Sequence, residues 1–123
     1  MIRHMAIPML LALGVMSLAL TGCRTAAPGV TSAAGTYETQ FHGSPEKVTE
    51  AAKAVLEEMH LTKVNSKWTN IDGLVTGETA QGTEVQVKVN RKDDKVSAVA
   101  VRVGYLGDKD MSLSILEKIK AKL

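Results

Sequence analysis

Cys23 is the only cysteine of this 123-residue chain and the side chain with the widest choice of chemistry. A lone cysteine can be a buried thiol, a nucleophile, half of an intermolecular disulfide or an attachment point. The residues before it help to decide. A basic start at Arg3 is followed by an almost wholly apolar run from Met5 to Leu20, which predicts a secretory signal peptide over residues 1–22. The run is shorter than the roughly 20 residues that a membrane-spanning helix needs.

The exit from this apolar run, Leu20-Thr-Gly-Cys23, resembles a bacterial lipobox. The resemblance implies diacylglyceryl transfer to the thiol of Cys23, cleavage before it and acylation of the new amino terminus. Several acyl chains anchor a protein firmly, since each buried CH₂ contributes about 0.8 kcal/mol. Arg24, where an aspartate would favour inner-membrane retention, predicts the periplasmic face of the outer membrane in a Gram-negative host. The alternative is a chance match in an ordinary secreted protein.

Histidines and paired acids offer little further chemistry. The histidines beyond the signal segment, His42 and His60, fall at the ends of a predicted strand and a predicted helix, and a zinc site would need a third ligand from distant acids. We expect both to be exposed. Asp93 and Asp94 stand among basic residues, which favours a soluble hairpin tip over an acid–base pair. We expect no metal, no cofactor and no catalytic residue.

Two motifs near the C-terminus have a chemical and a structural interpretation. Ser112 and Ser114 lack a G-x-S-x-G elbow and a neighbouring histidine, so we expect Ser112 to let the last helix approach the sheet. The turn Gly104-x-x-Gly107-Asp108 could bind an anion through free backbone N–H groups. We favour the alternative, in which the glycines adopt positive φ angles and Asp108 caps the helix.

Arg102 is the polar residue that we expect on an open sheet face. It lies opposite the valines of its strand and could pair with Glu78, Glu84 or the carboxylate of a partner. Alternatively, its stem simply covers that face. The residues that we consider for an interaction site are Arg102, Gly104, Gly107 and Asp108.

The hydrophobic pattern indicates the elements that position these residues. Their order is strand, helix, four strands and helix, with the helices starting at Ser44-Pro45 and at Asp108. Short turns join the strands antiparallel, and Asp72-Gly73 is the strongest turn signal. The predicted fold is a two-layer α+β sandwich, a mostly antiparallel sheet with two helices on one face. Strands are expected over residues 37–42, 62–69, 74–79, 84–90 and 96–103.

Composition divides the chain into three parts. Residues 1–22 form the signal peptide, residues 23–35 the acylated cysteine with a flexible tether of small polar residues, and residues 36–123 a single α+β domain. The formal net charge is +2, and loss of Arg3 brings it to about +1, which does not suit a nucleic-acid-binding protein. Aromatic residues are few, so the core must be mainly aliphatic.

The C-terminal stretch from Val101 to Leu123, with the strand at residues 82–87, resembles a family of small bacterial lipoproteins known only as a domain of unknown function. The resemblance extends from Thr36 onward and implies no activity. An aromatic or large apolar residue is expected at Tyr105 or Leu106. The order of elements is also similar to the helix-grip domains of a lipoprotein of the outer-membrane barrel assembly machine. The residues that carry the family resemblance are Val101, Arg102, Val103, Gly104, Gly107, Asp108, Ser112, Ile115 and Ile119.

Three classes of function remain open. The first, which we favour, is a lipid-anchored envelope protein that is not an enzyme and acts through structure or through an envelope protein partner. The second is a domain that binds a small ligand or a glycan, for which a deep apolar pocket beside the sheet would speak. The third is a hydrolase, which would require His42 or His60 to meet Ser112 or an acid in space.

Overall fold

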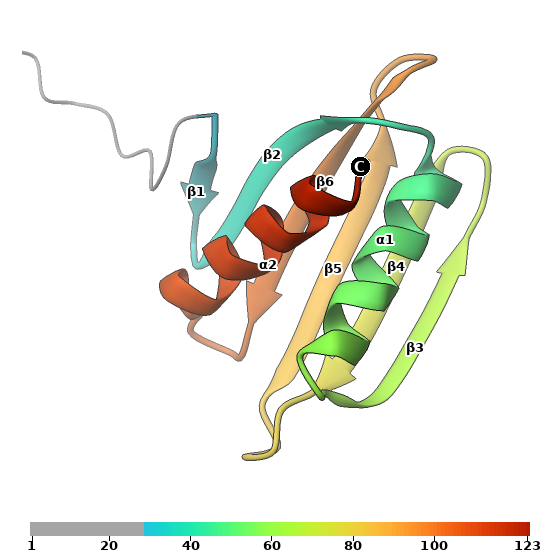
Figure 1. Ribbon diagram of the computed structural model, residues 1–123. Coiled ribbons are helices and arrows are strands. Elements are labelled where there is room, and N and C mark those ends of the chain that lie inside the picture. Colours follow the sequence, from blue (N-terminus) through green and yellow to red (C-terminus); the bar gives the residue numbers. More distant parts are fainter. Residues whose placement is uncertain (1–28) are drawn as a thin grey trace, which may run out of the picture.

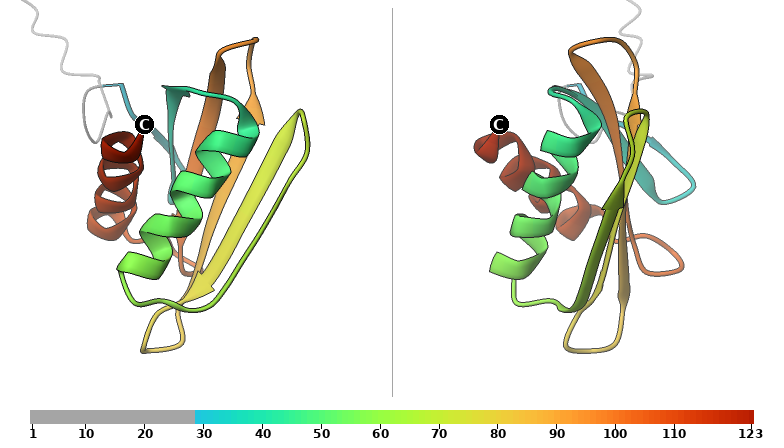
Figure 2. Two further views of the ribbon diagram at one scale, coloured as in Figure 1. Left: turned by 45° about the vertical axis from the view of Figure 1, so that its right-hand side comes forward. Right: turned by 90° about the vertical axis from the view of Figure 1, so that its right-hand side faces the viewer.

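The residues that the structure describes, 29–123, form one antiparallel sheet and two helices in this computed structural model (Figure 1). The strand order is β1-β2-β6-β5-β4-β3. Both helices pack on one face of the sheet, and the other face is open (Figure 2). The predicted two-layer α+β sandwich is therefore confirmed. The elements are β1 Thr31–Ala33, β2 Thr36–His42, α1 Pro45–Glu58, β3 Thr62–Trp68, β4 Asp72–Glu78, β5 Glu84–Arg91, β6 Val96–Val103 and α2 Lys109–Lys122.

The covered face of the sheet is built from the alternate valines of β5 and β6. Val87 stands opposite Val101, and Val89 stands opposite Val99, and all four are fully buried. Strand geometry sends successive side chains to opposite faces, so the alternation in the sequence becomes one apolar surface. Each fully buried side chain of this kind contributes about 1.5–3 kcal/mol. These rows of valines form the sheet side of the hydrophobic core, on which the helices pack.

Helix α1 covers the part of this sheet face that β3, β4 and β5 form. Ser44 caps it as predicted, since its hydroxyl accepts a hydrogen bond from the backbone N–H of Lys47 at 3.3 Å. The stripe that faces the sheet includes Val48, Val55 and Leu56, all fully buried. These residues recur at helical spacing, so one side of α1 is apolar and the other is wet.

The turn between β3 and β4 differs from the prediction. Asp72 and Gly73 are the first residues of β4, and the turn lies before them, where the hydroxyl of Thr69 donates to the Asp72 carboxylate at 2.7 Å. Gly73 serves a different purpose, because a Cβ there would overlap the hydroxyl of Thr49 on α1. The glycine permits close approach of α1 to the sheet, which no local turn pattern reveals.

The N-terminal limit of the domain also differs. Residues 31–33 form β1 on the edge of β2, Val30 is only 7% exposed, and the hydroxyl of Thr39 donates to the carbonyl of Gly29 at 2.9 Å. The prediction of a tether up to residue 35 is thus wrong for residues 30–35. Small polar residues carry no apolar period, so pairing with β2 could not be predicted from them. The signal peptide and Cys23 lie outside the described residues.

Neither α1 nor α2 has the length and apolar character that crossing a membrane would require, and this finding covers the described residues alone.

Candidate functional site

Arg102 ties together two turns that are far apart in the sequence. One Nη atom donates to the carbonyl of Ala34 at 2.6 Å and to the hydroxyl of Thr36 at 3.2 Å. The other Nη atom donates to the carbonyl of Tyr105. The fork geometry of guanidinium suits such simultaneous contacts. Arg102 therefore holds the β1–β2 turn against the β6–α2 turn.

These contacts correct the expected partners of Arg102. Glu78 pairs instead with Lys63, at 2.9 Å, and within residues 29–123 Arg102 forms no ion pair with Glu78 or Glu84. The pKa of Lys63 is raised by its hydrogen bond to Glu78 and by the negative charge of the Glu78 carboxylate. Because its donors are engaged by carbonyl groups and one hydroxyl, Arg102 acts as a structural clamp.

The glycines of the β6–α2 turn have the structural role that we favoured. Gly104 has φ 74° and Gly107 has φ 83°, which disfavours side chains at both positions. A Cβ on Gly107 would also overlap the backbone of Gly35 in the β1–β2 turn. Asp108 caps α2, since its carboxylate accepts from the N–H of Met111 at 3.0 Å. The carboxylate stands where an anion would bind, so the turn does not form an anion site.

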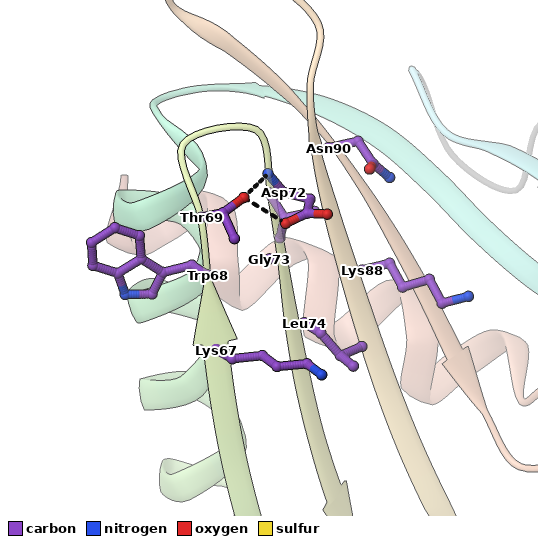
Figure 3. A pocket seen from close by; sticks show the side chains of 9 residues that line it. Lys67, Trp68, Thr69, Asp72, Gly73, Leu74, Lys88 and Asn90 are labelled. Carbon is purple, nitrogen blue, oxygen red and sulfur yellow. Dashed lines mark hydrogen bonds between the residues drawn. The ribbon is translucent and has the colours of Figure 1, made fainter.

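The open face of the sheet carries the most distinctive surface of the domain. Leu74 on β4 lies between Lys67 on β3 and Lys88 on β5 in one cross-strand row. The three line a hollow of about 450 Å³ that also includes Asp72 and Asn90 (Figure 3). Neither lysine forms an ion pair with another described residue. Two free cations thus flank a half-exposed leucine, an arrangement that we call the lysine–leucine row.

Trp68 belongs to the other side of the sheet although it follows Lys67 directly. It stands opposite Gly73 on the face that α1 covers, and its ring points away from Leu74 (Figure 3). The indole is 41% exposed, so it lies at the margin of the core. Trp68 thus borders the hollow, but its ring does not lie over the Leu74 side chain (Figure 3).

The remaining residues with chemical potential are dispersed. His42 and His60 are exposed as expected and lie beyond opposite ends of α1, a 14-residue helix that is about 21 Å long. Ser112 is fully buried, and its hydroxyl has no hydrogen-bond partner among the described residues. A buried serine and exposed histidines do not form a hydrolase site. Within the described part of the chain, no cluster of three His, Cys, Asp or Glu residues could hold a metal ion.

The acidic pair forms a hairpin tip, as the sequence indicated. The carboxylate of Asp93 accepts from the N–H of Lys95 at 2.8 Å, and the guanidinium of Arg91 donates to the carbonyl of Asp94 at 3.1 Å. Both acids therefore shape the β5–β6 turn. They do not face a cleft.

Sequence reasoning missed the lysine–leucine row. The alternation of residues 84–90 does place Lys88 on the face opposite the valines, and this was the available signal. The neighbours of Lys88 depend on the register among β3, β4 and β5. That register includes a bulge between Thr62 and Asn65, and no local pattern specifies it.

Comparison with known proteins gives a family without an activity. No curated protein matches the chain. A family model described as a protein of unknown function, DUF3568, matches residues 2–122. The match includes every described strand and helix and leaves out only Leu123 at the C-terminal end. The chain therefore belongs to the DUF3568 family.

Proposed function

We propose that this protein is a lipid-anchored component of the bacterial cell envelope that acts by binding another protein. The N-terminal pattern ending in Cys23 supports the anchor, because a basic start, an apolar run and a lipobox-like exit occur in that order. Arg24 after the cysteine supports the periplasmic face of the outer membrane. The protein functions without a cofactor and is not an enzyme.

The observation that carries the binding role is the lysine–leucine row. Lys67 and Lys88 present free ammonium groups on a rigid sheet, and Leu74 between them offers a small apolar contact. Opposite charges across an interface guide encounter and orientation, while a central apolar side chain gains from burial. A partner with two carboxylates around an apolar side chain would fit this row.

Crosslinking in the native envelope tests this role. A photo-crosslinking side chain at Gln86, next to the row on the open face, should capture a discrete protein, and one at Glu50, on the wet side of α1, should not. The double variant Lys67→Glu/Lys88→Glu should lose the adduct. Lys92→Glu/Lys95→Glu in the β5–β6 turn is the matched control and should keep it. Equal adducts from both positions, or an adduct that survives reversal of the row, would exclude the open face as the binding surface.

The anchor has its own test. Cys23→Ser should abolish labelling with a radioactive fatty acid and release the protein from the membrane fraction. Arg24→Asp should move the labelled protein to the inner-membrane fraction of a density gradient. Unchanged membrane binding of Cys23→Ser would overturn the lipid anchor.

The hollow supports a second candidate function, the binding of a small ligand or glycan. Its volume of about 450 Å³ lies within the range of about 300–1,000 Å³ that is usual for ligand pockets. Oligosaccharides prepared from the envelope should then raise the melting temperature of the wild type and leave that of Lys67→Glu/Lys88→Glu unchanged. No shift for the wild type would remove this candidate.

A further inference from the structure

The tip of the β6–α2 turn presents two adjacent apolar side chains to solvent. Tyr105 is 90% exposed and Leu106 is 84% exposed. Neither packs against the hydrophobic core. Isolated exposed apolar residues are ordinary, but adjacent ones on a projecting turn form a small contact surface. The β1–β2 turn lies beside this tip, and both turns project from the sheet on the side away from the helices (Figure 2).

The backbone beneath these two side chains is held in place without their help. Arg102 bonds the carbonyl of Tyr105 and that of Ala34, and Gly35 and Gly107 are in backbone contact. A surface on a preorganised backbone loses little conformational entropy when it is covered. The tip, defined here as Tyr105 with Leu106, is therefore suited to an external contact.

Chain length indicates what lies within reach of the tip. Only six residue steps separate Cys23 from Gly29, which is about 22 Å at full extension. The pairing of β1 with β2 removes the rest of the expected tether. From Gly29 the chain runs through Val30 and β1 to the turn at Ala34, about 17 Å along a strand, before it reaches the tip. The turn beside the tip therefore lies within about 40 Å of an acylated Cys23 along the chain, which leaves the bilayer surface within reach of the tip.

We propose that Tyr105 and Leu106 contact the bilayer interface and give the lipid-anchored domain a preferred orientation. This inference rests on the proposed lipid anchor. Tyrosine suits the interface because its ring is apolar and its hydroxyl remains hydrated, and leucine adds apolar area. Asp108 and Asp110 flank the tip, so attraction to anionic lipid does not drive the contact. Two side chains bind weakly by themselves, and the anchor supplies the effective concentration that they need.

The test uses the chain from Cys23 onward, which contains every described strand and helix. Its single thiol can be coupled to a maleimide lipid in phosphatidylcholine vesicles, independently of acylation in cells. Leu106→Trp and, as a matched control at another exposed turn residue, Ile71→Trp are each made in a Trp68→Phe background. On coupled vesicles, the emission of Leu106→Trp should shift to shorter wavelength and be quenched by brominated lipid. Ile71→Trp should show neither effect.

A second measurement avoids the introduced tryptophan. Coupling to vesicles should slow amide hydrogen exchange at residues 104–107 in the wild type and not in Tyr105→Ser/Leu106→Ser. Equal quenching of the two tryptophans, or equal exchange in the wild type and the serine variant, would overturn the membrane contact. That result would leave the lipid anchor intact, because fractionation of Cys23→Ser decides the anchor separately.

Discussion

The two faces of the sheet are built by the same strands and have opposite properties. On β5, Val85, Val87 and Val89 are fully buried beneath the helices, whereas Lys88 between them is exposed. On β6, Ala98 belongs to the open face yet is only 4% exposed, since its longer neighbours shield it. Successive residues of one strand therefore have different roles: those on the covered face stabilise the fold, and those on the open face are available to bind a partner. We expect substitutions on the covered face to change folding and substitutions on the open face to change binding.

The largest expected effect compares two leucines on opposite sides of this division. Leu56→Ala on α1 should lower the free energy of unfolding by about 2–5 kcal/mol, because it leaves a cavity in a fully packed core. Leu74→Ala on the open face should cost less than about 1 kcal/mol, because water can occupy the site. Urea unfolding followed by circular dichroism measures both. Similar losses for the two variants would break the distinction between the faces.

The next effect tests how closely α1 approaches the covered face. Gly73→Ala should cost about 1–3 kcal/mol, because its Cβ would overlap the hydroxyl of Thr49. Thr49→Ala should cost only about 1 kcal/mol, for its buried methyl group, since its hydroxyl has no hydrogen-bond partner among residues 29–123. The double variant should then be more stable than the sum of the single effects predicts. Additive losses in urea unfolding would mean that this contact does not limit the packing of α1.

A smaller effect on stability is expected at Arg102, and it can be compared with the effect at Lys88 on the same face. Arg102→Met should cost about 1–2 kcal/mol, because it removes hydrogen bonds that join two turns. Amide exchange at residues 34–36 and 104–107 should accelerate. Lys88→Met, which removes one charge from the same face, should change stability by no more than about 0.5 kcal/mol. Equal effects of the two variants would show that Arg102 acts only as a surface charge.

The smallest expected effect concerns pH at the edge strand. The pKa of Lys63 is raised above its usual value of 10.5 by its hydrogen bond to Glu78 and by the charge of that residue. A raised pKa in the folded state stabilises the protein fully below pH 10.5, and this stabilisation disappears as pH rises through the folded value. Melting temperatures between pH 8 and about pH 11.5 should fall slightly more for the wild type than for Lys63→Met. Parallel curves would show that the ion pair does not contribute.

Local patterns in the sequence predicted most of the architecture. Ser44 and Asp108 cap their helices as expected, because an N-cap needs only its own side chain and the next three residues. The valine alternation of β5 and β6 defined the covered face for the same reason. Where the prediction failed, at β1 and at Asp72-Gly73, the outcome depended on a neighbouring strand and on α1. Thr49 of α1 is distant from Gly73 in the sequence. Strand β2 follows β1 after only two residues, and β1 was missed because residues 30–35 carry no apolar period.

The candidate sites, too, combine features that short-range sequence patterns predict with features that only the tertiary structure reveals. The sequence by itself determined the helices, five of the six strands, the two-layer fold and the lipobox-like motif at Cys23, because each follows from short-range spacing and residue type. Only the tertiary structure decided that Lys67 and Lys88 flank Leu74, since strand register places them. It also decided that Arg102 bonds a carbonyl 68 residues earlier rather than a carboxylate. Contacts at such separation arise from the packing of the whole sheet, which no local pattern encodes.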